Sequence, residues 1–382
     1  MSGFTGLPRK DFQQRIQTIR EYLSEKKLDA LFAFSDEYRP GNTLYLSDYY
    51  PINVIEESPQ GVYVPVEGEV VLFLGAINAK TARGISWIED IRSIEEMDRF
   101  FQRRNEEKGR KLQVGLVGEA LLPVRYYRRM RSALEGSEFV DAEEIIQRMR
   151  AIKSPAEIER MQNVAHLGDA ALRAAVLRMK SDPVTENDLA AAAEHVIRSA
   201  GGNIGSATII AAGIHTTMPT WRPSDKIIEP GEAVLIDVNP LLQGYCADVA
   251  ITAFKGKVEG EKKHVHDLSR QILRGAIKHM QPGLPASTIY DYFLERSREA
   301  GYEQFFTLYA KGMRAVGHGV GLDVVEWPNL DADSAFILEP GMTLGVKFDL
   351  HGFDFGGVRM EVDVLVEENG CRSLNSIIDE AL

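Results

Sequence analysis

Residues 231–252 read GEAVLIDVNPLLQGYCADVAIT, and this stretch decides the fold. One apolar run ends at Asp237, a turn containing Asn, Pro and Gly follows, and a second run begins at Asp248. Two strands joined by a short turn pair with each other, so the two carboxylates are expected to lie close across the ladder. They repel unless a positive group lies between them, and a divalent cation commonly fills that role. The alternative is that either Asp only caps a turn.

Two later motifs add metal-ligand chemistry. The run 317–322, GHGVGL, surrounds His318 with three glycines, which let the backbone approach closely and leave the imidazole uncrowded. The run 356–366, GGVRMEVDVLV, alternates Arg, Glu361 and Asp with apolar residues, so the three charged side chains share one strand face. Two Asp, one His and one Glu would form an oxygen-rich site suited to Mn, Co, Fe or Zn. A structural histidine and a solvated strand face are the alternatives.

The composition narrows the class of protein. The 382 residues include 44 basic and 56 acidic side chains, a formal net charge of -12 that argues against nucleic acid as a partner. No apolar run approaches the roughly 20 residues needed to span a membrane, and the first residues lack the apolar core of a signal peptide. Cys246 and Cys371 are too few for a disulfide scaffold or a thiolate zinc site. We expect a cytoplasmic protein with no membrane partner.

The pattern of apolar residues divides the chain near residues 148–154. Before this point helical and strand patterns alternate, which predicts a small layered α/β domain at 1–150. Ser154 followed by proline and an acid two positions later is a helix start, and the helix is predicted to reach Lys180. The rest of 151–382 reads as a helix, strands, two helices and strands again; the predicted helices cover 186–200, 262–280 and 286–300.

The ordered motifs resemble the M24 metallopeptidase family, in its creatinase, aminopeptidase P and prolidase branch. The resemblance covers nearly the whole chain, including RAIKSPAEI at 150–158, which is similar to the entry to the catalytic domain of that branch. It implies an α/β (α+β) fold with a creatinase-like N-terminal domain and a C-terminal pita-bread domain, in a homodimer. It also implies a small-molecule or dipeptide-like substrate, whose C–N bond is attacked by a hydroxide activated between two divalent metals.

Four of the five metal-ligand positions of the family match: Asp237, Asp248, His318 and Glu361. The fifth does not, because GMTLGVKF at 341–348 places Lys347 where the family has its first Glu. The family's H-E-x-P is replaced by VEWP at 325–328, which loses a His and retains Glu326. A further family His corresponds to Thr220. These departures put ordinary peptidase activity in doubt.

Charge counting leaves three states for Lys347. Four carboxylates match two divalent metals, whereas three carboxylates and one ammonium match a single metal. Lys347 therefore replaces one ion while one remains, or it replaces both and pairs with the acids, or it is neutral and acts as a general base or nucleophile. The sequence thus predicts at most one divalent metal.

The lost imidazoles need replacements if proton transfer persists. His215 lies in the loop before the first Asp strand, and His351 lies between Lys347 and Glu361. We name both as candidate catalytic residues together with Lys347 and Glu326, and a structural role is the alternative for each histidine. The leading hypothesis is a hydrolase that cleaves an amide, peptide or amidine bond of a small substrate. A metal-independent creatinase-like hydrolase or lyase and a non-catalytic binding protein remain as alternatives.

Overall fold

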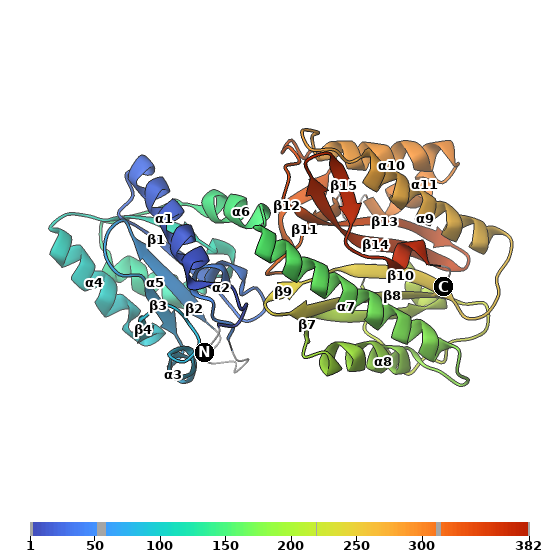
Figure 1. The fold of residues 1–382 in the computed structure, drawn as a ribbon, viewed down its shortest axis with the longest axis horizontal. Coiled ribbons are helices and arrows are strands. Elements are labelled where there is room, and N and C mark those ends of the chain that lie inside the picture. Colours follow the sequence, from blue (N-terminus) through green and yellow to red (C-terminus); the bar gives the residue numbers. More distant parts are fainter. Residues whose placement is uncertain (1–2, 52–58, 219, 311–314, 381–382) are drawn as a thin grey trace. The chain divides into compact units, whose positions relative to one another are not determined.

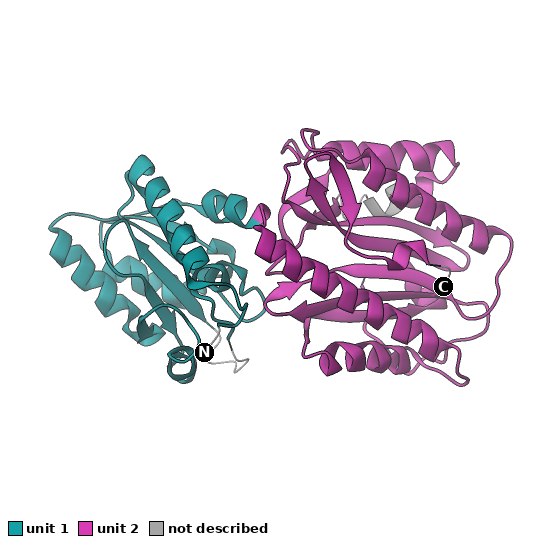
Figure 2. Ribbon diagram, viewed as in Figure 1, with its two compact units in different colours: residues 1–150 teal, residues 151–382 magenta. Residues whose placement is uncertain are grey.

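The computed structural model describes residues 3–51, 59–218, 220–310 and 315–380. The chain forms two compact units, Met1–Arg150 and Ala151–Leu382 (Figure 2). Among the described residues, no helix is both long and apolar enough to cross a membrane.

The first unit is built on a six-stranded mixed sheet with the order β4-β3-β2-β1-β5-β6 (Figure 1). The central strand β1 runs antiparallel to β2 and parallel to β5. The strands are β1 (Ala30–Ser35), β2 (Gln60–Pro65), β3 (Val71–Leu74), β4 (Asp90–Ser93), β5 (Gln113–Val117) and β6 (Glu138–Asp141). The helices are α1 (Arg9–Lys26), α2 (Gly41–Ser47), α3 (Ala76–Ala82), α4 (Met97–Lys108), α5 (Val124–Ala133) and α6 (Glu143–Ala151).

An aromatic cluster fills the core of this unit. Phe32 of β1 meets Phe101 of α4 edge to face, with ring centroids 5.4 Å apart, and Phe73 of β3 meets Phe100 at 5.3 Å. Edge-to-face pairs stabilise a core beyond the area they bury. The α/β layering predicted for the first 150 residues is confirmed.

The second unit is a nine-stranded antiparallel sheet with the order β12-β11-β13-β14-β10-β8-β7, to which β15 adds on β14 and β9 on β8. The strands are β7 (Asn203–Ala212), β8 (Ala233–Leu242), β9 (Tyr245–Cys246), β10 (Val249–Phe254), β11 (Ala315–Gly319), β12 (Glu326–Asp331), β13 (Thr343–Phe353), β14 (Gly356–Glu367) and β15 (Gly370–Ser373). The helices α7 (Pro155–Met179), α8 (Glu186–Ser199), α9 (Glu261–His279), α10 (Ser287–Glu299) and α11 (Glu303–Ala310) pack against this curled sheet (Figure 1). The implied pita-bread architecture is confirmed.

The predicted helices of this unit are confirmed to within a residue or two. Ser154 caps α7 as expected: its hydroxyl accepts from the Glu157 amide, and Glu157 in turn accepts from the Ser154 amide. The short helix α11 was not predicted, because its sequence EQFFTLYA is apolar without a clear helical period.

The register of the central strands brings the motif residues together. Ala250 of β10 pairs with Asp237 of β8 on one side and with Glu361 of β14 on the other. Lys347 of β13 pairs with Glu361. Residues directly opposite each other in an antiparallel ladder point to the same face, so these side chains gather on one face of the sheet.

Candidate metal centre

Three of the predicted ligands form a compact group. One ligand atom each of Asp248, His318 and Glu361 lies within 4.8 Å of the others, and all three residues are buried. His318 Nε2 is 3.4 Å from Asp248 Oδ2. His318 Nδ1 lies 3.0 Å from the carbonyl oxygen of Gly319, which can only accept, so Nδ1 carries the hydrogen and the neutral form of the ring has its lone pair at Nε2. Two carboxylates and this nitrogen are a donor set that divalent transition metals favour.

Glu361 gives the clearest sign of a cation. Its side chain is fully buried, and its Oε1 has no hydrogen-bond donor among the described residues. Burial, together with the neighbouring Asp248, raises the pKa of Glu361 well above its usual value. A buried carboxylate oxygen without a donor is costly, and a cation in contact with it would remove that cost. These residues therefore fit one divalent ion.

Asp237 lies in a different environment. Arg359 Nη1 donates to Asp237 Oδ2 at 3.0 Å, while Arg359 Nε donates to Asp349 Oδ1, also at 3.0 Å. Burial and the charge of Asp248 raise the pKa of Asp237 to about 6, although Arg359 opposes this. Asn239 joins the two parts of the site, since its amide donates to Asp248 Oδ1 at 2.6 Å and lies 3.5 Å from Asp237 Oδ1.

Sequence reasoning missed Asn239 and Asp349 as parts of the site. Asn239 was interpreted only as a turn residue, and its place two positions after Asp237, on the same strand face, was the signal available. Arg359 was placed on the correct strand face, and that face is buried rather than solvated: Arg359 is 4% exposed, Glu361 1% and Asp363 0%. Asp363 accepts from the Asp248 amide and so fixes the backbone that carries this ligand.

Lys347 points into the cluster. Its Nζ lies 3.8 Å from Glu361 Oε1, and its side chain is 12% exposed. The Glu361 carboxylate raises the pKa of Lys347 above its usual value, against the effect of burial. This contact favours the charged ammonium over the neutral lysine that was one of the three alternatives.

Glu326 is held in another buried ion pair. Its carboxylate lies 3.4 Å from Lys153 Nζ and accepts from the Asp323 amide at 3.1 Å. These contacts give Glu326 a structural role at the start of β12. Its predicted catalytic role stays a prediction.

Both candidate histidines neighbour Thr216: His215 precedes it in the chain, and His351 contacts its carbonyl. His215 Nδ1 is 2.8 Å from Glu186 Oε1, and the ring stacks on Trp221. His351 Nδ1 donates to the Thr216 carbonyl at 2.9 Å, and its Nε2 lies 3.9 Å from Asp349 Oδ1. Burial lowers the pKa of His351, so it is neutral at physiological pH.

Comparison with known proteins identifies the chain. Residues 159–368 match the model of metallopeptidase family M24, and residues 15–152 match the creatinase/prolidase N-terminal domain. The chain belongs to metallopeptidase family M24. It is 26% identical over 363 residues to the Xaa-Pro dipeptidase of Pyrococcus horikoshii, with 94% of this chain and 96% of that protein covered.

Solved structures agree with this M24 assignment. The prolidase from Pyrococcus horikoshii OT3 matches with a TM-score of 0.83 at 25% identity, covering 95% of this chain and 98% of that one. The X-Pro aminopeptidase from Thermotoga maritima MSB8 shares the fold, with a TM-score of 0.83 at 24% identity over 94% of this chain and 97% of that one.

The charges of the M24 cluster fit one ion. Four carboxylates, those of Asp237, Asp248, Asp349 and Glu361, face two protein cations, Lys347 and Arg359. When all are ionised, two negative charges remain, which equals the charge of a single divalent cation. A second ion would leave the buried cluster positive and is disfavoured in a low-dielectric interior.

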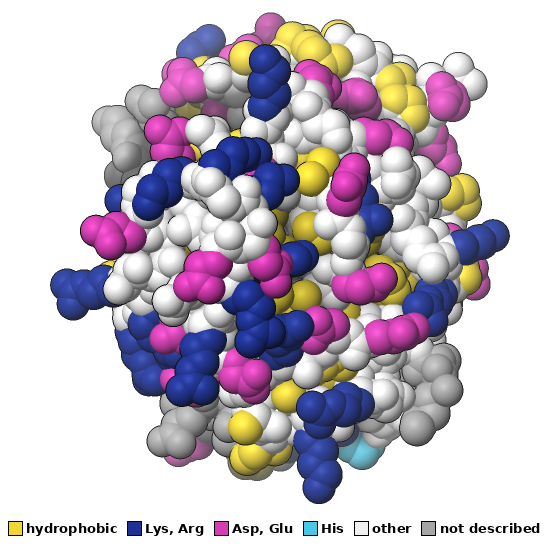
Figure 3. Space-filling model, turned by 90° about the vertical axis from the view of Figure 1, so that its left-hand side faces the viewer, with side chains coloured by type: hydrophobic (Ala, Val, Ile, Leu, Met, Phe, Trp, Pro, Cys, Tyr) yellow, Lys and Arg dark blue, Asp and Glu magenta, His cyan; other side chains and the backbone are white. Residues whose placement is uncertain are grey.

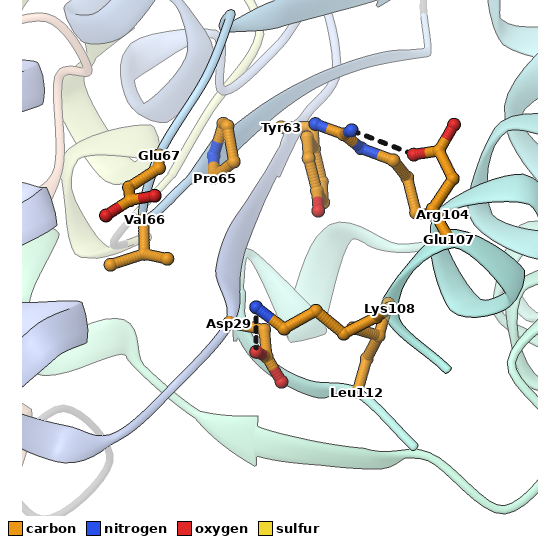
Figure 4. Close-up of a pocket in the computed structure, with 9 residues that line it drawn as sticks. All are labelled: Asp29, Tyr63, Pro65, Val66, Glu67, Arg104, Glu107, Lys108 and Leu112. Carbon is orange, nitrogen blue, oxygen red and sulfur yellow. Dashed lines mark hydrogen bonds and ion pairs between the residues drawn. The ribbon is translucent and has the colours of Figure 1, made fainter. Parts of the chain in front are cut away.

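A pocket of about 200 Å³ lies in the first unit, and its lining residues are Asp29, Tyr63, Pro65, Val66, Glu67, Arg104, Glu107, Lys108 and Leu112 (Figure 4). Ion pairs join Lys108 to Asp29 at 3.3 Å and Arg104 to Glu107 at 3.1 Å. These charges therefore satisfy each other and do not indicate a ligand. On the face seen in Figure 3, basic and acidic side chains are likewise interspersed.

Proposed function

We propose that this M24 protein holds one divalent cation at Asp248, His318 and Glu361 and hydrolyses a C–N bond of a small, dipeptide-like substrate. The observation that carries this proposal is the buried Glu361 oxygen without a hydrogen-bond donor among the described residues, set beside Asp248 and His318. Mn, Co, Fe and Zn all suit such a donor set.

Each residue has a role that follows from its contacts. A bound ion would supply Lewis-acid polarisation of the substrate carbonyl. Glu361 fixes the ammonium of Lys347, which offers a preorganised positive charge to an oxygen that becomes negative in the transition state. Arg359 holds Asp237, and Asn239 and Asp363 orient Asp248.

The substrate class is inferred from relatives. The similar proteins from Pyrococcus horikoshii and Pyrococcus furiosus are named Xaa-Pro dipeptidases, and the chain aligns with 96% and 100% of their lengths. An amide followed by proline is therefore the first bond to test. The homodimer and the cytoplasmic location implied earlier stay predictions.

A second candidate is a metal-independent hydrolase or lyase, and Lys347 is the observation that favours it. Its ammonium already lies at ion-pair distance from Glu361, where a second cation would otherwise be expected. If Lys347 and Arg359 together neutralise enough of the cluster, the substrate carbonyl would be polarised by protein groups alone.

Elemental analysis combined with turnover tests the proposal. The purified chain is analysed as isolated, stripped with a chelator, reloaded with Mn, Co, Fe or Zn, and assayed on Xaa-Pro dipeptides and small amides and amidines. We expect one ion per chain and hydrolysis that the chelator abolishes and the metal restores. If the chelator does not change the rate of turnover, the metal-independent hypothesis would replace the proposal. A metal-free chain without turnover that retains a stoichiometric protein partner would support a binding protein.

A further inference from the structure

Glu186, the first residue of α8, is a fully buried carboxylate. It accepts five hydrogen bonds, from the Ala212 amide (2.8 Å), His215 Nδ1 (2.8 Å), Trp221 Nε1 (3.1 Å), the Ser224 amide (3.1 Å) and the Ser224 hydroxyl (2.6 Å). Two carboxylate oxygens offer about four lone-pair positions. The other donors therefore already satisfy Glu186, and His215 is not needed for that purpose.

The contact with Glu186 fixes the tautomer of His215. Burial works against ionisation, but the hydrogen bonds from Ser224 and His215 lower the pKa of Glu186, so it is an ionised acceptor at neutral pH. Since a carboxylate can only accept, Nδ1 of His215 carries the hydrogen, and in the neutral form of the ring the lone pair is at Nε2. The side chain of His215 is 24% exposed, so the ring is not sealed inside the unit.

Trp221 connects this imidazole to the face that carries the candidate metal centre. Trp221 packs on Ala211, Leu235 and Ala250. Ala250 stands opposite both Asp237 and Glu361 in the ladder, so its side chain lies on the same face as theirs. The rings of His215 and Trp221 stack with their centroids 4.0 Å apart.

The turn that carries His215 is also fixed to the site strands. His215 belongs to the 3-10 helix Gly213–Thr217. Its neighbour Thr216 accepts from His351 of β13 through its carbonyl and from the Gly357 amide of β14 through its hydroxyl. Gly357 precedes Arg359 by two residues on the same strand. Through Thr216, the turn that carries His215 is thus held by both strands that carry Lys347 and Glu361.

We propose that His215 transfers the proton in the hydrolysis, that Glu186 is its positioning residue, and that Trp221 forms a flat wall for an apolar substrate group beside the scissile bond. This inference rests on the proposed function and assigns the acid–base group that it lacks. The substrate class is narrowed to compounds with an aromatic or large aliphatic group next to the amide.

The proton taken from water is returned to the product within the site. Water gives a proton to His215 Nε2 while its oxygen forms a bond to the carbonyl carbon, and the imidazolium is balanced by Glu186. When the C–N bond breaks, Nε2 returns the same proton to the leaving nitrogen. The products are a carboxylic acid and an amine, and no other reactant is needed.

The first test is His215→Gln in the metal-loaded full chain, assayed on Phe-Pro and Gly-Pro. We expect kcat to fall by about 10²-fold or more, with KM and metal content little changed. Free imidazole is expected to restore part of the rate of His215→Gly. His195→Gln, which changes an exposed histidine of α8, is the matched control. A kcat within twofold of the unmodified chain would overturn the inference while leaving the proposed function intact.

The second test measures which nitrogen of the His215 imidazole carries the hydrogen. Nitrogen-15 NMR of histidine-labelled chain, assigned with His215→Gln, is expected to show His215 protonated at Nδ1 and bare at Nε2. Glu186→Gln is expected to lose this tautomer preference, and thermal unfolding reports whether that variant is folded. A signal protonated at Nε2 in the unmodified chain would overturn the assignment. If the unmodified chain shows no turnover with any of the four metals, both the proposed function and this inference are overturned. A loss of turnover confined to the variant is a different outcome and leaves the proposed function intact.

Discussion

The two halves of the candidate centre use the same kind of ligand in opposite ways. In the half formed by Asp248, His318 and Glu361, a buried carboxylate oxygen has no donor among the described residues. In the half around Asp237, Arg359 bridges that carboxylate and Asp349 with two 3.0 Å hydrogen bonds. Both halves are buried and belong to one sheet, with Asp248 just before β10 and the other residues on its strands.

This difference shows that retention of a ligand residue does not fix its partner. Asp237 is satisfied by a protein cation, whereas the one ion pair of Glu361 among the described residues is the long 3.8 Å contact with Lys347. Because an ion pair at that distance leaves room for a closer cation, the first half is the better host for a metal. Substitutions in each half test whether the two halves bind their cations independently or act as one site.

The largest effect is expected from Asp248→Asn. This change removes a charged ligand from the half that lacks internal compensation, so bound metal is expected to fall to background in elemental analysis. Hydrolysis should drop about 10³-fold, since Lewis-acid polarisation contributes several kcal/mol and each 1.4 kcal/mol is tenfold in rate. The exposed Asp267→Asn is the control and is expected to change neither quantity. Full metal content in Asp248→Asn would contradict the assignment of this half.

The next largest effect is expected on the free energy of unfolding, in the half of the site around Asp237. Arg359→Met would leave Asp237 and Asp349 buried without their shared cation, and breaking a buried pair by removing one partner costs about 3–5 kcal/mol. Urea unfolding should show this loss in the free energy of unfolding. Lys263→Met, which breaks an exposed pair with Asp267, should cost less than about 1 kcal/mol. Equal losses in both variants would mean that the Arg359 bridge contributes no more than a surface pair.

A third experiment tests whether the site, which is proposed to hold one metal ion beside Lys347, can be converted into a site for two metal ions. Lys347→Glu adds a carboxylate and removes an ammonium beside Glu361, so the cluster becomes two charges more negative. We expect elemental analysis to change from about one to about two ions per chain, and metal to raise the melting temperature more than in the unmodified chain.

Lys347→Met is the matched control, because it removes the charge without adding a ligand. An unchanged stoichiometry of one ion in Lys347→Glu would mean that Arg359 still occupies the second position and that Lys347 is not the residue that limits metal loading.

The sequence could predict which residues gather in the candidate site but not which partners they contact. Strand alternation placed Arg359, Glu361 and Asp363 on one face, and the glycine frame singled out His318, because both depend on local pattern. Whether Arg359 reaches Asp237 depends on register between residues 122 positions apart, and no local pattern reports that register. Asp349 lies only ten residues from Arg359 and directly opposite it in the β13–β14 pair, and it was missed because the segment between them was not interpreted as a hairpin.

The same limit explains why the contacts of His215 and Glu326 were not predicted. Glu326 was named as a catalytic candidate because it is retained from the family motif, and His215 because of its place in the loop before the first Asp strand. The structure pairs Glu326 with Lys153, 173 residues away, and pairs His215 with Glu186 at the start of a helix. The helix start at Thr185 was predictable from its capping residues, but the path of the loop that returns to Glu186 was not.

The smallest expected effect is at Asn239, the one side chain among the described residues that contacts carboxylates of both halves directly through its amide. Asn239→Ala leaves every proposed ligand in place and removes the side-chain amide, which donates to Asp248 and Asp237 and accepts from the Ala207 backbone. Outer-shell partners of metal ligands typically contribute 10–100-fold in affinity, so we expect metal to bind about tenfold more weakly in competition with a chelator. Asn329→Ala, at an exposed position of β12, is the control. If Asn239→Ala instead abolishes binding, the two halves are coupled through this amide, and Asp237 belongs to the metal site despite its bond to Arg359.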